Sequence, residues 1–171
     1  MIVGAVLTQN CAWKNVEKAI KNLKKARVLF PKRILSLPPG KLKKLIRPAG
    51  FYNQKAKRLK LITEKYLQLK PRICSLSTEQ LRKELLSVNG IGNETADSIL
   101  LYAFNRPVFV VDAYTKRFCN HFKLFKGKTY HDYQHFFEKN LMAHWGNSDQ
   151  HIFNEYHALI VRWAKDYGRK K

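Results

Sequence analysis

The chain has 171 residues, enough for one compact unit or two small ones, and its apolar fraction of 45% is ordinary for a folded protein. Lys and Arg number 33 against 12 Asp and Glu, which gives a formal charge of +21. The composition excludes a disordered chain. The charge favours nucleic acid as the partner over ribosomal or anionic-membrane attachment, neither of which needs so large an apolar and aromatic core.

Apolar periodicity, N-cap residues and Gly/Pro breaks together predict an all-α protein. Thr78, Asp112 and Ser148 each stand where an N-cap would satisfy exposed backbone N–H groups. The β-branched run from Val108 to Val111 is too short for a convincing strand and could equally lead into a helix. The expected helices cover Ile2 to Thr8, Trp13 to Ala26, Lys41 to Ile46, Asn53 to Leu69, Thr78 to Ser87, Asn93 to Phe104, Asp112 to Phe122, Tyr130 to Met142 and Ser148 to Tyr167.

The opening segment M-I-V-G-A-V-L-T-Q is apolar, but it has no basic leader and is too short to cross a bilayer. We expect neither a signal peptide nor a membrane contact. A start inside an apolar helix also suggests that an upstream element is missing or supplied otherwise. Cys11, Cys74 and Cys119 lack C-x-x-C spacing, which argues against a disulfide framework and indicates a reducing compartment. We expect a cytoplasmic protein of a prokaryote, associated with the nucleoid.

The linker V-N-G-I-G joins two expected helices and is long enough only for a tight hairpin. Glycine adopts backbone angles that other residues resist, and the N–H groups of Gly90 and Gly92 at a helix N-terminus can bind phosphate without a side chain. On G-x-G alone, a simple helix terminator is the commoner reading. Val88 before the glycines, Ile91 between them and apolar faces on both helices favour a phosphate-binding helix-hairpin-helix.

Asp112 follows an apolar run and opens a helix, which leaves two interpretations. It could be an N-cap worth about 1 kcal/mol, or a catalytic carboxylate. His131 and His135 lie one helical turn apart and could chelate a metal, but no third ligand stands near them in the sequence, so we expect no metal site.

Five blocks in order resemble the endonuclease III-like (HhH-GPD) superfamily of DNA glycosylases. They are L-T-Q-N-C-A-W-K-N-V-E-K-A, R-P-A-G-F-Y-N-Q-K-A-K-R-L, V-N-G-I-G-N-E-T-A-D-S-I-L, F-V-V-D-A-Y-T and N-E-Y-H-A-L-I-V. The second block is most similar to the 3-methyladenine DNA glycosylases. The resemblance implies a bilobed all-α fold with DNA across the cleft. Residues 1–124 would form a six-helix lobe with the hairpin at about 78–104, and residues 125–171 the C-terminal part of a second lobe, with a soft boundary near Gly127.

The resemblance also implies roles for individual residues. A damaged nucleotide would be flipped out and its N-glycosidic bond cut, with Asp112 stabilising the sugar cation and orienting or activating water. Gln9 would fill the gap in the duplex and Phe51 would wedge into the opposite strand. The alternatives for these two are a helix-terminal amide and a core aromatic. Trp13 and Tyr52 could stack on the flipped base. Further predicted contacts are Asn53, Lys55 and Lys116 with DNA, and Glu94 beside the base.

The sequence departs from parts of the family pattern. Relatives that also nick DNA carry a lysine at the position of Glu94, and a carboxylate cannot form an imine, so we expect no efficient lyase activity. Lys116, one turn beyond Asp112, is a poor candidate to replace that lysine. Many relatives end with four cysteines that bind an iron–sulfur cluster, whereas no cysteine follows Cys119, so no cluster is expected. The resemblance is compatible with an alkali ion at the hairpin carbonyls.

The sequence thus predicts a monomeric, monofunctional DNA N-glycosylase of base-excision repair that acts on alkylated purines such as 3-methyladenine in double-stranded DNA. One alternative is an enzyme of the same fold, with or without lyase activity, that acts on oxidised or mismatched pyrimidines. The other is a non-catalytic helix-hairpin-helix module that only binds DNA.

Overall fold

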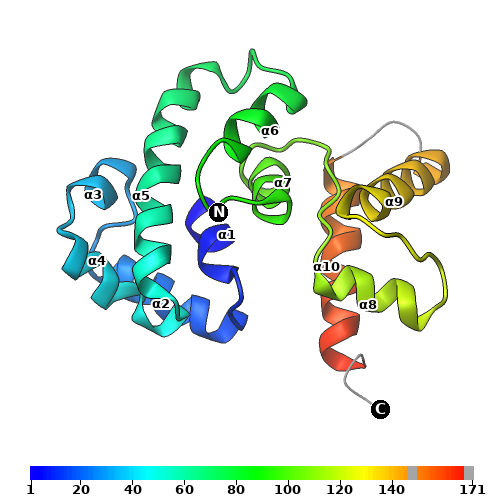
Figure 1. Ribbon diagram of the computed structural model, residues 1–171, viewed down its shortest axis with the longest axis horizontal. Coiled ribbons are helices and arrows are strands. Elements are labelled where there is room, and N and C mark those ends of the chain that lie inside the picture. The colour runs from blue at the N-terminus through cyan, green and yellow to red at the C-terminus, as the bar shows by residue number, and fades with distance from the viewer. Residues whose placement is uncertain (146–149, 168–171) are drawn as a thin grey trace. The chain divides into compact units, whose positions relative to one another are not determined.

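The structure, a computed structural model, describes residues 1–145 and 150–167, and its regular elements there are all helical (Figure 1). This confirms the predicted all-α fold. In chain order the elements are α1 (Ile2–Thr8), α2 (Trp13–Lys25), α3 (Pro31–Ser36), α4 (Pro39–Ile46), η1 (Arg47–Ala49), α5 (Tyr52–Leu69), η2 (Lys70–Arg72), α6 (Thr78–Leu86), α7 (Asn93–Ala103), α8 (Ala113–His121), α9 (Tyr130–Trp145) and α10 (Gln150–Asp166). No helix in the described ranges is both long and apolar enough to span a bilayer.

The sequence missed the short helix α3 and placed the start of α4 too late. Both helices begin with a proline, which the sequence analysis treats only as a break. Proline is compatible with the first helical position, because the N–H that it lacks would have no intrahelical partner there. Breaks such as F-P-K and L-P-P-G therefore mark helix starts as well as ends.

Two of the predicted N-caps can be compared with the structure. The cap of α6 is Ser77 and not Thr78: Ser77 Oγ accepts from Gln80 N, and Ser77 N donates to Gln80 Oε1. Asp112 caps α8 as predicted. Ser148, the third expected cap, lies outside the described residues.

The first of two compact units comprises Met1–Ile99. Its longest helix, α5, packs against α1, α3 and α4, while α2 packs against α1, α4 and η1. The helices meet through aliphatic side chains that are almost fully removed from water, which is the main stabilising contribution to such a unit. These include Leu7, Leu23, Leu42, Ile46, Leu59, Ile62, Leu81 and Leu85.

The second unit, Leu100–Lys171, begins within α7, well before the expected boundary at residues 124 and 125. The difference arises because α8 packs on α10 and shares an aromatic core with α9 and α10. Phe109 is at the centre of this core, stacked on Phe137 at 4.5 Å and edge-on to Phe153 at 6.0 Å between ring centroids. Asp112 therefore belongs to the second unit.

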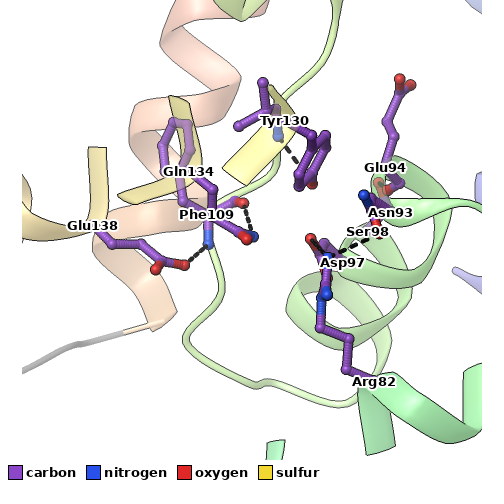
Figure 2. Close-up of polar contacts among 10 residues, drawn as sticks. Arg82, Asn93, Glu94, Asp97, Ser98, Phe109, Tyr130, Gln134 and Glu138 are labelled. Atoms are coloured by element: carbon purple, nitrogen blue, oxygen red, sulfur yellow. Dashed lines mark hydrogen bonds and ion pairs between the residues drawn. The ribbon is translucent and has the colours of Figure 1, made fainter. Parts of the chain in front are cut away.

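The run from Val108 to Val111 forms neither a strand nor a helix, and three of its backbone groups bond to side chains of α9. Phe109 N donates to Glu138 Oε1 at 2.9 Å and Phe109 O accepts from Gln134 Nε2 at 2.8 Å (Figure 2). Val111 N donates to Tyr130 Oη at 3.3 Å. Buried peptide groups need partners, so these bonds allow an extended apolar segment to cross the core without a sheet. The segment leads directly into Asp112.

Candidate active site

The hairpin between α6 and α7 depends on glycine at position 90. Gly90 has φ +85°, and Ile91 N donates to Val88 O at 3.0 Å to close the turn. A Cβ at Gly90 would lie 2.3 Å from Arg58 Nε, whereas a Cβ at Gly92 would meet nothing within 4 Å. Val88 and Ile91 are buried below the turn. The fold thus requires glycine at position 90. At position 92 a side chain would fit, and glycine only keeps the surface of the turn uncovered.

A charged pair fixes the two helices of the hairpin to each other. Arg82 on α6 donates from Nε to Asp97 Oδ1 at 2.7 Å and from Nη2 to Asp97 Oδ2 at 3.2 Å, and also reaches Asn93 Oδ1 at 3.1 Å (Figure 2). Asp97 is fully buried, and a bidentate guanidinium is the partner that offsets the cost of burying a carboxylate. Neither residue of this pair stands out in the sequence alone.

Gln9 connects the end of α1 to the hairpin. Its Nε2 donates to Gly90 O at 3.0 Å and to Thr95 Oγ1 at 2.9 Å, and its Oε1 accepts from Arg58 Nη1 at 2.7 Å. In this structure Gln9 is therefore an amide at the end of helix α1, which is one of the two interpretations that the sequence left open. The same bonds place Gln9 at the predicted DNA-binding turn, so insertion into a duplex stays a prediction. Arg58 and Thr95 were missed because their partners are distant in sequence.

The expected DNA contact by Lys55 is wrong. Its side chain is 1% exposed, and Nζ donates to Leu7 O at 2.8 Å and to Ala49 O at 2.7 Å. These carbonyls lie at the ends of α1 and η1, where carbonyls have no intrahelical donor. Burial lowers the pKa of the Lys55 amine, with Arg58 adding to the effect and Cys11 opposing it. Lys55 is a structural lysine.

We expect Lys55→Met to lower the free energy of unfolding by about 1–3 kcal/mol, because it leaves two buried carbonyls without a donor. Urea denaturation would measure the loss, with Lys57→Met, an exposed lysine of the same helix, as the matched control. A Lys55→Met protein as stable as the wild type but weaker in DNA binding would instead restore the DNA-contact interpretation.

Several other predicted site residues are exposed in the first unit. Phe51 is 63% exposed, which excludes its interpretation as a core aromatic. It has φ +43°, a strained left-handed conformation for a bulky residue.

Trp13 is 47% exposed and donates from Nε1 to Glu17 Oε1 at 2.9 Å. Tyr52 is half-buried at the start of α5. Asn53 and Glu94 are exposed, and Figure 2 shows Glu94 extending away from Asp97.

Asp112, in the second unit, caps α8 and keeps a partly open side chain. Its Oδ1 accepts from Thr115 N at 2.8 Å and Thr115 Oγ1 at 3.0 Å, and Asp112 N donates to Thr115 Oγ1 at 3.3 Å. This confirms the N-cap interpretation. The side chain nevertheless retains 15% exposure, so capping and a catalytic role are compatible. Lys116, one turn later, is exposed, with its Nζ 5.7 Å from the centroid of the Tyr133 ring.

The second oxygen of Asp112 faces a histidine that the sequence analysis missed. His157 Nε2 on α10 lies 3.5 Å from Asp112 Oδ2. Burial by itself raises the pKa of the Asp112 carboxyl, but the contact with His157 and the hydrogen bonds from Thr115 outweigh it and hold the pKa below its ordinary value. Asp112 is therefore an anion at neutral pH, as a group that stabilises a developing cation must be.

A signal for His157 was present in the sequence. It stands in N-E-Y-H-A-L-I-V, at helical spacing from Phe153, Ile160 and Ala164, so it occupies the buried face of an amphipathic helix. A polar residue on such a face needs a partner. What the sequence could not supply was the identity of that partner.

The described residues contain no cluster of three or more His, Cys, Asp or Glu side chains arranged to hold a metal ion. The cysteines differ in environment: Cys11 is half-buried, Cys74 exposed and Cys119 buried. Three thiols cannot supply the four thiolates of an iron–sulfur cluster, so the donor set of this chain does not fit that group.

Comparisons with known proteins identify the family of this chain. Residues 3–142 match the family model described as "HhH-GPD superfamily base excision DNA repair protein". A Methanocaldococcus jannaschii protein named "Putative DNA repair glycosylase MJ1434" is 50% identical over 100% of this chain and 78% of its own length. Endonuclease III of Thermotoga maritima is 30% identical over 75% of this chain and 58% of its own length.

Two solved structures are similar to this chain. The H. pylori 3-methyladenine DNA glycosylase MagIII, bound to 1,N6-ethenoadenine, has a TM-score of 0.83 and 34% identity, and the match covers 96% of this chain and 83% of that one. An endonuclease III–DNA complex, at 20% identity and a TM-score of 0.76 over 99% of this chain and 74% of that one, shares the fold. By the family match and its close relative, the chain belongs to the HhH-GPD superfamily of base-excision DNA repair proteins.

Proposed function

We propose that this base-excision repair glycosylase is monofunctional and hydrolyses the N-glycosidic bond of alkylated purines in double-stranded DNA. The observation that carries the proposal is the state of Asp112: a carboxylate with 15% side-chain exposure, held at one oxygen by Thr115 and kept anionic by its surroundings. It stands at the end of a buried apolar segment, in the sequence context F-V-V-D-A-Y-T that resembles the catalytic block of the family.

The chemistry needs an anion and little else from the protein. As the glycosidic bond breaks, the sugar acquires positive charge, and a fixed carboxylate stabilises that charge more strongly in the transition state than in the ground state. Alkylation makes the purine cationic and so a better leaving group, which removes the need for a strong general acid. Water then adds to the sugar, with Asp112 orienting it or accepting its proton.

Features of the first unit support DNA as the substrate. The exposed Phe51 ring has the size and exposure of a wedge that can enter a base stack, and its strained backbone is the kind of local cost found at functional positions. The open surface at Gly92 allows close approach of a phosphate to the main chain. The formal charge of +21 favours binding to a polyanion.

Glu94 supports monofunctional chemistry, because it occupies the position where lyase members of the family carry their imine-forming lysine. Hydrolysis by water also needs no redox centre, which fits the three-cysteine composition. Alkylated purines are favoured as substrates because the similar H. pylori protein is named a 3-methyladenine DNA glycosylase and is bound to a modified adenine. We propose that the protein acts as a monomer in the cytoplasm.

We expect the protein to release free 3-methyladenine from methylated duplex DNA and to leave an abasic site that breaks only after alkali. Chromatography of the released bases would detect the product, and borohydride should trap no protein–DNA adduct. A panel of duplexes with an oxidised pyrimidine, uracil or a mismatched thymine would serve as the specificity control. Release from one of those alone would overturn the alkylated-purine assignment, and a borohydride-trapped adduct would overturn the monofunctional one. DNA binding without release of any base would identify a non-catalytic module.

A further inference from the structure

In the second unit the side chain of His157 lies between those of Tyr102 and Asp112. We propose that Tyr102 and His157 are positioning residues, in which the Tyr102 hydroxyl fixes the tautomer of His157 so that Nε2–H points at Asp112 Oδ2 and holds the carboxylate in its working orientation. The inference rests on the proposed function, since it assigns Asp112 as the group that needs orientation. Neither Tyr102 nor His157 is required to touch the substrate.

The geometry of the three side chains supports this arrangement. Tyr102 Oη on α7 lies 2.5 Å from His157 Nδ1, and His157 Nε2 lies 3.5 Å from Asp112 Oδ2. His157 is 7% exposed. Its Nε2 is buried and makes no hydrogen bond of good geometry within the part of the chain that the structure describes, so the carboxylate is the polar group it faces. A buried N–H without a full partner is costly, and a small movement of Asp112 Oδ2 would satisfy it.

The partners of the two ring nitrogens decide which of them carries the proton. Burial, together with the negative charge of Asp112, raises the pKa of the Tyr102 hydroxyl, so it stays protonated and can donate to Nδ1, whereas the Asp112 carboxylate beside Nε2 can only accept. When the hydroxyl donates to Nδ1, that nitrogen is the acceptor of the neutral ring, and the ring proton is on Nε2. The nitrogen that faces Asp112 is then a donor.

No other charged side chain competes for the imidazole in the described contacts. The Phe109 ring packs edge-on at 84° against the His157 ring, with 6.2 Å between centroids, and covers one side of the imidazole. From α9, Glu138 accepts from Phe109 N and Tyr130 accepts from Val111 N. From α8, Thr115 binds the other oxygen of Asp112. The titratable groups in line with His157 are Tyr102 and Asp112.

The arrangement has a consequence for the reaction. Thr115 holds only Oδ1 of Asp112, and a carboxylate held at one oxygen can rotate about its terminal torsion, which is a soft one. A donor at Oδ2 removes this freedom and favours the anion. Misplacement of a reacting group by a fraction of an ångström is enough to slow an oriented reaction. His157 thus supplies orientation and charge stabilisation through Asp112.

The test compares His157→Leu, which keeps bulk without a donor, with His157→Gln, whose amide can still donate to Oδ2. We expect His157→Leu to slow single-turnover base release by about 10–100-fold, as is typical when a residue that orients a reacting ligand is removed, and His157→Gln to restore part of the rate. The acid limb of the rate–pH profile should move to higher pH in His157→Leu, because the Asp112 carboxyl loses an interaction that keeps its pKa low. Affinity for a duplex with an abasic-site analogue should not change.

A second measurement does not depend on activity. Nitrogen-15 NMR of the folded wild-type protein should show His157 as the Nε2–H tautomer, and Tyr102→Phe should shift that signal towards a tautomer mixture. His135→Leu, which removes an exposed histidine of α9, is the matched control and should leave both the rate and the His157 signal unchanged. An Nδ1–H tautomer in the wild type, or a signal that does not respond to Tyr102→Phe, would overturn the inference.

The outcomes separate this inference from the proposed function. If the wild type releases base while Asp112→Asn does not, and a folded His157→Leu keeps the wild-type rate and pH profile, the positioning role is wrong and the glycosylase assignment stands. If His157→Leu does not fold, His157→Gln and Tyr102→Phe carry the comparison, and wild-type rate–pH profiles in both would also refute the role. If the wild type releases no base from any duplex, the proposed function fails, and the NMR result alone decides whether the Tyr102–His157 arrangement exists.

Discussion

Asp112→Asn is expected to reduce single-turnover release of an alkylated base by about 100- to 1,000-fold while leaving the fold and the affinity for abasic-site DNA near those of the wild type. The amide keeps the size of the carboxylate but carries no negative charge. Loss of one preorganised electrostatic group from an active site typically costs about 10²–10³ in rate, and here the group is the one proposed to face the sugar cation.

The substitution removes the charge of Asp112 but keeps its capping role, because asparagine is as good an N-cap as aspartate. Its side-chain oxygen can accept the same bond from Thr115 N that Oδ1 accepts at 2.8 Å. The capping of α8 should therefore survive, and the thermal midpoint at neutral pH should change little. The measurement is the single-turnover rate, together with DNA affinity by fluorescence anisotropy.

The pH dependence of stability gives a second readout of the same residue. The pKa of Asp112 is lower in the folded protein than its ordinary value, so its ionisation stabilises the fold above the unfolded-state pKa, and that contribution is lost as the pH falls through the folded-state pKa. Asp112→Asn has no such group. The stability of the variant should accordingly fall less than that of the wild type on acidification.

Asp132→Asn is the matched control. Asp132 is also a carboxylate at the N-terminus of a helix of the second unit, and its Oδ2 accepts from Lys128 N and Thr129 N at 2.8 Å each. Those hydrogen bonds lower the pKa of the Asp132 carboxyl, as comparable contacts do at Asp112. Base release should be unaffected by Asp132→Asn. Wild-type release by Asp112→Asn would remove the catalytic assignment and leave Asp112 as an N-cap alone.

The sequence was informative where a property depends on neighbours along the chain. Helix periodicity located α1, α5 and the two helices of the hairpin to within one residue at each end. The tight turn at V-N-G-I-G and the capping role of Asp112 are likewise local, since each is set by residues no more than a few positions apart. These features fix the framework on which the candidate site is built.

The sequence was uninformative where a side chain finds its partner across the fold. Lys55 looks like a surface lysine in the basic run K-A-K-R, and only the packing of α5 against α1 brings it to Leu7 O. Arg58 and Gln9 meet for the same reason. His157 and Tyr102 are 55 residues apart, and their contact depends on how α10 docks in the second unit. A single sequence records which residues need partners, but not which partners they find.

The two hairpin glycines are expected to respond differently to alanine. Gly90→Ala should lower the free energy of unfolding by about 2–4 kcal/mol, because alanine resists φ +85° and its Cβ would lie 2.3 Å from Arg58 Nε. Displacing Arg58 would also disturb its bond to Gln9, which anchors the turn through Gly90 O. Gly92→Ala meets no atom within 4 Å and should fold with wild-type stability.

Measurements of DNA affinity test whether Gly92 contributes to binding or can be replaced without effect. If a phosphate approaches the main chain at the turn, a methyl group at position 92 occupies its path, and duplex affinity should fall about tenfold although the fold is intact. Gly40→Ala is the control, since Gly40 also has open space around a prospective Cβ but lies at the start of α4. Urea denaturation and fluorescence anisotropy on the three variants would give the comparison. Wild-type affinity in Gly92→Ala would mean that no phosphate comes close there, and wild-type stability in Gly90→Ala would mean that the turn tolerates a side chain after all.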